Sequence, residues 1–84
     1  MGTFQNYNNA GGPGARLATN QFVQVSCKVY DTTIASASPG GYWYRIADSP
    51  FNNAYYSPAN SFWNGDIPGQ LPYTHSFDAA VPNC

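Results

Sequence analysis

Proline and glycine interrupt this 84-residue chain so often that no apolar pattern runs long enough to form a helix. Breakers fall about every eight to twelve residues, which is the spacing of short strands separated by turns. The chain is also 17% aromatic, whereas disordered chains rich in Gly, Pro, Asn and Ser lack aromatic residues. We therefore predict one small all-β domain with a packed aromatic core.

The clearest strand pattern is Phe22–Tyr30, with the sequence FVQVSCKVY. Its residues alternate, as expected for a strand with two different faces. The apolar face would be composed of Val23, Val25, Cys27 and Val29. The polar face would be composed of Gln24, Ser26 and Lys28. This pattern places the Cys27 side chain under or beside the core.

Two further strands are predicted after the small, polar loop 31–41. The segment YWYRIA (42–47) has aromatic or amphipathic residues on both faces, so neither face is plainly exposed to solvent. A turn over 48–53 leads to a short strand, Ala54–Tyr56, which Pro58 ends. Residues 2–16 are rich in Gly and Asn, and we interpret them as an irregular entry strand.

The chain has two cysteines, Cys27 and Cys84, and we expect them to form a disulfide. One bridge would compensate for the thin core of a small exported protein and stabilise it by about 4 kcal/mol. The alternative is two unrelated buried thiols.

No signal peptide is visible, and no apolar run approaches the roughly twenty residues of a membrane span. We expect a secreted protein whose signal has been removed and whose natural chain is longer.

Charge and titratable residues argue against several functions. Three Lys/Arg residues and four acidic residues, all Asp, provide no electrostatic surface for nucleic acid or an anionic membrane. The single histidine, His75, has Asp78 nearby, but this pair lies in a loop-like tail without a nucleophile motif. One His and two bridged cysteines cannot ligate zinc. We expect no enzyme activity, no cofactor and no metal.

Two stretches of the sequence resemble an SH3 barrel: Trp43-Tyr44-Arg45-Ile46, and Tyr56-Ser57-Pro58-Ala59-Asn60-Ser61-Phe62. In that family an aromatic pair opens the third strand, and a 3₁₀ turn, here residues 57–60, precedes the last strand. The whole chain is similar to SH3-like modules of secreted actinobacterial proteins. This resemblance implies an irregular entry segment (1–15), an SH3-like barrel (16–62) and an irregular C-terminal extension (63–84) tied back by the disulfide.

The resemblance also implies a ligand class. Peptide-binding SH3 domains carry an acidic loop, but residues 31–41 contain only Asp31 as an acidic group. A proline-rich ligand with an arginine anchor is therefore disfavoured. Bacterial SH3-like modules more often resemble cell-wall targeting domains, which recognise peptidoglycan stems or bridges. That ligand also fits an exported protein.

Aromatic side chains are the candidate binding residues. The resemblance places Trp43 at the groove tryptophan, where its flat face would pack against a ligand; the alternative is a core tryptophan, because either strand face could be the inner one. Asn60 could contact ligand or bind the backbone of its own turn. Tyr55 is a weaker candidate than Tyr56, because adjacent strand residues point in opposite directions. The expected ligand-binding set is Trp43, Tyr56, Asn60, Trp63, Tyr42 and Tyr73.

These observations predict a monomeric, non-catalytic extracellular module that binds peptidoglycan or a peptide through an aromatic groove. The alternative is a structural or interaction domain that packs against another domain of a larger secreted protein, or against a second copy of itself.

Overall fold

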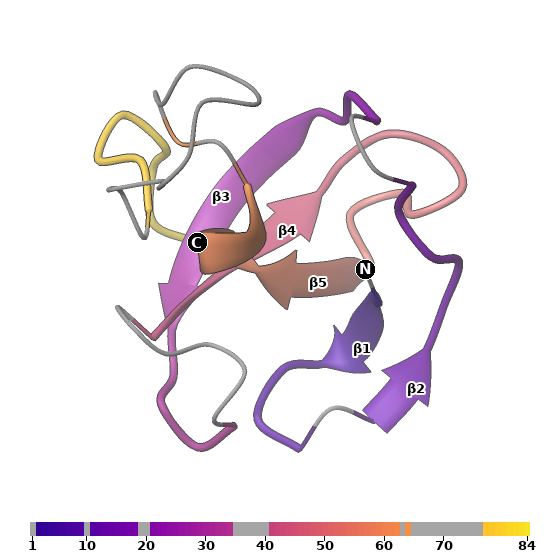
Figure 1. Cartoon of the computed structure of the whole chain (residues 1–84), viewed down its shortest axis with the longest axis horizontal. Coiled ribbons are helices and arrows are strands. Elements are labelled where there is room, and N and C mark those ends of the chain that lie inside the picture. The colour runs from indigo at the N-terminus through magenta and orange to yellow at the C-terminus, as the bar shows by residue number, and fades with distance from the viewer. Residues whose placement is uncertain (1, 10, 19–20, 35–40, 63, 65–76) are drawn as a thin grey trace.

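The computed structural model describes residues 2–9, 11–18, 21–34, 41–62, 64 and 77–84. Within these ranges, five strands form one antiparallel sheet, and no α-helix is present (Figure 1). The elements are β1 (Phe4–Asn6), β2 (Gly11–Pro13), β3 (Val25–Tyr30), β4 (Tyr42–Ile46), β5 (Tyr55–Pro58) and the 3₁₀ turn η2 (Ala59–Ser61). The predicted all-β class is confirmed.

The sheet is open rather than closed. Its strand order is β2-β1-β5-β4-β3, so that β2 and β3 are the two edges. The expected SH3-like barrel is therefore not confirmed. Segment 1–15, expected to be irregular, contributes both β1 and β2 to this sheet. The expected 3₁₀ turn is present as η2, one to two residues further along than residues 57–60.

The hairpin between β4 and β5 follows the predicted turn. Asn52 and Asn53 both have left-handed backbone conformations, with φ of 52° and 61°. Asparagine tolerates this region better than other residues with a side chain. The Asn53 N–H donates to the Ile46 carbonyl oxygen (2.9 Å), which closes the turn directly after β4.

One face of the sheet carries the apolar core. Ile46 of β4 packs there with Leu17 and Phe51, and all three side chains are buried. Tyr55 lies directly opposite Ile46 in the β4–β5 register, so its side chain points to the same face. Half-buried side chains complete this core: Val23, Tyr55 and Phe62.

A β-bulge at Ser26 changes the predicted faces of β3. Val25 pairs with Ile46, but Cys27 pairs with Arg45, so Ser26 is an extra residue in β3. Because Arg45 and Ile46 point to opposite faces of β4, Val25 lies on the core face and Cys27 on the other. The prediction that Val25, Cys27 and Val29 share one apolar face was therefore wrong, since simple alternation does not allow for an inserted residue.

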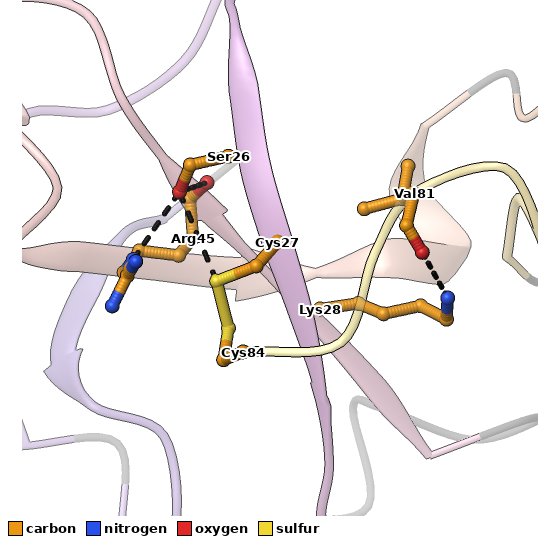
Figure 2. The surroundings of a disulfide bond; sticks show 6 residues. All are labelled: Ser26, Cys27, Lys28, Arg45, Val81 and Cys84. Carbon is orange, nitrogen blue, oxygen red and sulfur yellow. Dashed lines mark hydrogen bonds between the residues drawn. A yellow bond between two sulfur atoms is a disulfide. The ribbon is translucent and has the colours of Figure 1, made fainter.

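The C-terminal residues cover the outer edge of β3. The Lys28 N–H donates to the Pro82 carbonyl (2.8 Å), and the Cys84 N–H donates to the Lys28 carbonyl (2.9 Å), which makes a parallel bridge between Lys28 and Asn83. The predicted Cys27–Cys84 disulfide is present beside this bridge, with the two Cα atoms 4.9 Å apart (Figure 2). The edge that β3 would otherwise expose is thus occupied by the chain itself.

Tyr44 connects β4 to two distant segments. Its hydroxyl accepts a hydrogen bond from the Asp78 N–H (2.7 Å) and donates one to Asn64 Oδ1. Asn64 Nδ2 in turn donates to the Ala59 carbonyl (2.8 Å). Burial raises the pKa of the Tyr44 hydroxyl; the hydrogen bond from Asp78 opposes this shift, and the Asp78 negative charge adds to it.

The edge contact generates a first prediction. Replacing Cys84 by serine (Cys84→Ser) should lower the free energy of unfolding by about 4 kcal/mol, because the bridge closes a long loop in the unfolded chain. The residues around the bridge should open before the sheet does. Amide hydrogen exchange of the variant should therefore be faster at Lys28 and at position 84 than at Tyr44 and Arg45. Equal loss of protection at all four amides would contradict this order of opening.

A second prediction concerns alkaline pH. Because the folded-state pKa of Tyr44 is raised, the unfolded chain ionises first once the pH passes about 10, and the free energy of unfolding falls until the folded-state pKa is passed. Tyr44→Phe should reduce this alkaline loss. At pH 7 the variant should be about 1–3 kcal/mol less stable, because Asn64 Oδ1 and the Asp78 N–H lose their partner.

Urea unfolding of wild type and Tyr44→Phe between pH 7 and 11 measures both effects. Tyr30→Phe provides the matched control, since Tyr30 is exposed. An unchanged alkaline slope in Tyr44→Phe would show that this hydroxyl is not responsible for it.

Candidate functional site

Trp43 belongs to the protein interior. Its side chain is 0% exposed, and its indole N–H donates to the Asp31 carbonyl oxygen (3.1 Å). Its neighbours in the sheet are Val29 of β3 and Pro58 of β5, and Phe4 meets its ring edge-on at 6.5 Å between centroids. The expectation that Trp43 offers its face to a ligand is therefore wrong, and the core alternative holds.

The two half-buried tyrosines of the predicted site, Tyr42 and Tyr56, lie on opposite faces of the sheet. Tyr56 pairs with Arg45, whereas Tyr42 is three residues away on β4 and points to the other side. The sheet therefore does not bring these two rings into one groove. The β4–β5 register decides this arrangement, and it cannot be read from the spacing of the aromatic residues.

The other residues of the predicted ligand-binding set do not add to a groove among the described residues. Asn60 is half-buried in η2, and its Oδ1 accepts a hydrogen bond from the adjacent Ser61 hydroxyl (3.4 Å). Trp63 and Tyr73 lie outside the described residues, as does His75. Tyr55 faces the core beside Phe51, at 6.4 Å between ring centroids.

An aromatic surface that the sequence did not predict forms where β3 ends. Tyr30 lies opposite Tyr42, and their rings meet edge-on at 5.2 Å between centroids. Phe77 also packs against Tyr42, with the ring centroids 4.3 Å apart. We call these three residues the Tyr30 cluster. Tyr30 is 63% exposed, so the cluster presents a ring to solvent.

The Lys28 side chain lies next to Tyr42 of the Tyr30 cluster. Its side chain was expected on a polar face but is only 6% exposed, because the C-terminal residues cover it. The Lys28 ammonium group donates to the Val81 carbonyl and lies 5.7 Å from the centre of the Tyr42 ring. This position favours a cation–π contact that holds Tyr42 in place.

Gly41 allows Tyr30 to lie close to the chain. It has a φ of 73°, and a Cβ at this position would lie 3.0 Å from the Tyr30 ring and 2.6 Å from Thr32 Cγ2. Glycine is therefore required both by the backbone conformation and by the space available. In the sequence, only the strand-end position of Tyr30 hinted at this cluster; nothing indicated that Phe77 would join it.

On the opposite face, one row of residues crosses all five strands. Successive register pairs place these residues side by side in the order Pro13, Phe4, Tyr56, Arg45 and Cys27. Tyr7 packs edge-on against Tyr56, with ring centroids 4.9 Å apart. The middle of this face therefore combines half-buried aromatic rings with a guanidinium group.

The acidic groups near these surfaces bond locally. Asp31 Oδ1 accepts the Thr33 N–H (2.8 Å), and hydrogen bonds from the Thr33 side chain and backbone lower the pKa of the Asp31 carboxyl. Asp78 Oδ1 accepts the Ala80 N–H (2.9 Å). Among the described residues, no group of three or more His, Cys, Asp and Glu side chains lies together as a metal site would require.

No protein-family model, curated protein or solved structure matches this chain. Within the described ranges, no helix has the length and apolar character needed to cross a membrane.

The placement of Trp43 generates a third prediction. The chain has two tryptophans, so Trp63→Phe leaves Trp43 as the only indole. Its fluorescence emission should be blue-shifted and poorly quenched by acrylamide, because the ring is buried. Urea should shift the emission to the red and restore quenching, which serves as the internal control. Full quenching of the folded variant would place Trp43 at the surface instead.

Proposed function

We propose that this protein is a non-catalytic extracellular binding module that recognises bacterial cell-wall peptidoglycan through the Tyr30 cluster. The observation that carries the proposal is the exposure of Tyr30, 63%, on a ring already held by Tyr42. An exposed tyrosine offers a flat apolar surface together with a hydroxyl that can donate or accept a hydrogen bond. Sugar rings and short peptides both suit such a surface.

Rigidity supports this assignment. Tyr42 is in ring contact with both Tyr30 and Phe77, and Phe77 lies in the segment that the Cys27–Cys84 disulfide ties to β3. A ring that is already positioned loses little conformational entropy when a ligand binds. With a formal net charge of −1, the chain would bind by contact area and hydrogen bonds rather than by electrostatic steering.

An extracellular location is supported by the cysteines. Both are used in the disulfide, and disulfides persist mainly in oxidising compartments.

A second candidate function is contact with another domain or another copy of this chain. Phe22, three residues before β3, is 84% exposed, and contact with a partner would remove this apolar ring from water. Phe22 precedes β3 by three residues and Tyr30 is its last residue, and the strand between them, Val25–Tyr30, spans about 17 Å at about 3.3 Å per residue. One variant at each position therefore separates the two functions.

The fourth prediction tests both candidates with wild type, Tyr30→Ala and Phe22→Ala. Sedimentation with insoluble peptidoglycan should retain wild type and Phe22→Ala equally. Tyr30→Ala should bind about tenfold more weakly, equivalent to about 1.4 kcal/mol. Far-UV circular dichroism should be the same for all three proteins, because both replaced side chains are exposed. Tyr30→Ala should unfold at a slightly lower temperature than the other two, because it loses the ring contact with Tyr42.

Two outcomes would overturn the proposal. Absence of wild-type retention, or equal retention of wild type and Tyr30→Ala, would exclude wall binding through the Tyr30 cluster. Concentration-dependent sedimentation of wild type that Phe22→Ala abolishes, without retention on the wall, would favour the interaction domain.

A further inference from the structure

Arg45 lies in the middle of the sheet face that also carries the buried Trp43, and it has no carboxylate partner among the described residues. The three described aspartates are each engaged elsewhere: Asp31 by Thr33, Asp48 by the Gln24 N–H (3.2 Å), and Asp78 by Ala80. The side chain of Arg45 is half-buried. A guanidinium group that has lost part of its hydration gains more from an anionic partner than a fully exposed one does.

The position of Arg45 is set by the β-bulge. Arg45 Nε–H donates to Ser26 Oγ (3.2 Å), and the Ser26 hydroxyl donates to the Arg45 carbonyl oxygen (3.2 Å). Figure 2 shows the guanidinium group extending away from the disulfide, with Ser26 beside its Nε. The Ser26 contact occupies Nε, so the N–H groups on the two terminal nitrogens remain for a ligand. Two of them, side by side, match the two oxygens of a carboxylate.

Two tyrosines lie near this guanidinium group. Tyr56 is the direct cross-strand neighbour of Arg45, so the Cβ atoms of the pair are about 5 Å apart. Tyr7 packs edge-on against Tyr56 and widens the aromatic surface. A ligand that places a carboxylate on Arg45 would therefore bring its adjoining group against the tyrosines.

We propose that Arg45, Tyr56 and Tyr7 form a binding site for a carboxylate attached to a sugar ring. The carboxylate bonds to the terminal nitrogens of Arg45, and the ring packs against Tyr56 and Tyr7. This site is on the opposite face from the Tyr30 cluster and does not depend on it. The inference would stand if the protein showed no retention on insoluble peptidoglycan.

Matched small molecules test the proposal in solution. N-acetylmuramic acid carries a carboxylate on an N-acetylated sugar ring, N-acetylglucosamine has the ring without the carboxylate, and N-acetylalanine has the carboxylate without the ring. Each is titrated into ¹⁵N-labelled protein at pH 7 and low ionic strength. N-acetylmuramic acid should shift the amide signals of Ser26, Arg45, Tyr56 and Tyr7, with a dissociation constant on the order of 1 mM.

The other two compounds should bind at least several-fold more weakly, because each lacks one of the two contacts. Added salt should weaken the binding of N-acetylmuramic acid, since the main contact is ionic. If N-acetylglucosamine bound as tightly as N-acetylmuramic acid, the carboxylate would not contribute to binding. If N-acetylalanine bound as tightly, the sugar ring would not contribute.

Arg45→Gln is the decisive variant, because it keeps a hydrogen-bonding side chain and removes the charge. It should weaken binding of N-acetylmuramic acid about tenfold or more, while Phe22→Ala should titrate like wild type. Well-dispersed amide signals of Arg45→Gln before titration would show that the variant is folded. Unchanged affinity of this variant, shifts confined to other residues, or no shifts in wild type would overturn the proposal.

Discussion

The pairing of residues 82–84 with the outer edge of β3 is the contact on which the outer half of the structure depends. Lys28 makes backbone hydrogen bonds to Pro82 and Cys84, and the disulfide at Cys27 lies next to them. These contacts bring residues 77–84 over Tyr42 and Tyr44. They also bury the Lys28 side chain, and they place Phe77 against the Tyr42 ring. Without this edge contact, the Tyr30 cluster would lack one of its three rings.

The β-bulge at Ser26 is the second feature on which the structure depends. It reverses which face of the sheet successive side chains of β3 point to, so the residues before and after it follow different patterns. Before the bulge, Val25 contributes to the face that holds the Ile46 core. After it, Cys27 lies on the opposite face, next to Arg45. The bulged residue also fixes Arg45 through its hydroxyl. One inserted residue therefore positions both the disulfide and the proposed carboxylate site, in keeping with the tendency of bulges to re-aim side chains.

Both faces of the sheet thus carry aromatic surfaces, but they differ in chemistry. The Tyr30 cluster is supported by a buried lysine whose ammonium group is already bonded to Val81. The Arg45 site has a guanidinium group with its terminal nitrogens available and tyrosines beside it. The first surface suits stacking with an uncharged ring or peptide, and the second suits a ligand with a negative charge.

Local patterns in the sequence were sufficient for the all-β class, for the strands β3, β4 and β5 and for the turn at Asn52 and Asn53. The residues that carry these signals are close together in the chain. The disulfide was predicted from the presence of two cysteines in a small chain with a thin core. The open sheet, in place of a barrel, depends on which strands pair, and that depends on contacts between distant segments.

The candidate site was decided mostly by tertiary structure. The sequence identified Tyr42 and Tyr56 as aromatic candidates, but strand register put them on opposite faces. Trp43 became a core residue because neighbouring strands and Phe4 enclose it. The pairing of residues 82–84 with β3 places Phe77 against Tyr42, and the bulge at Ser26 positions Arg45. Alternation along one strand shows that two faces exist, but only packing against the rest of the chain decides which face is buried.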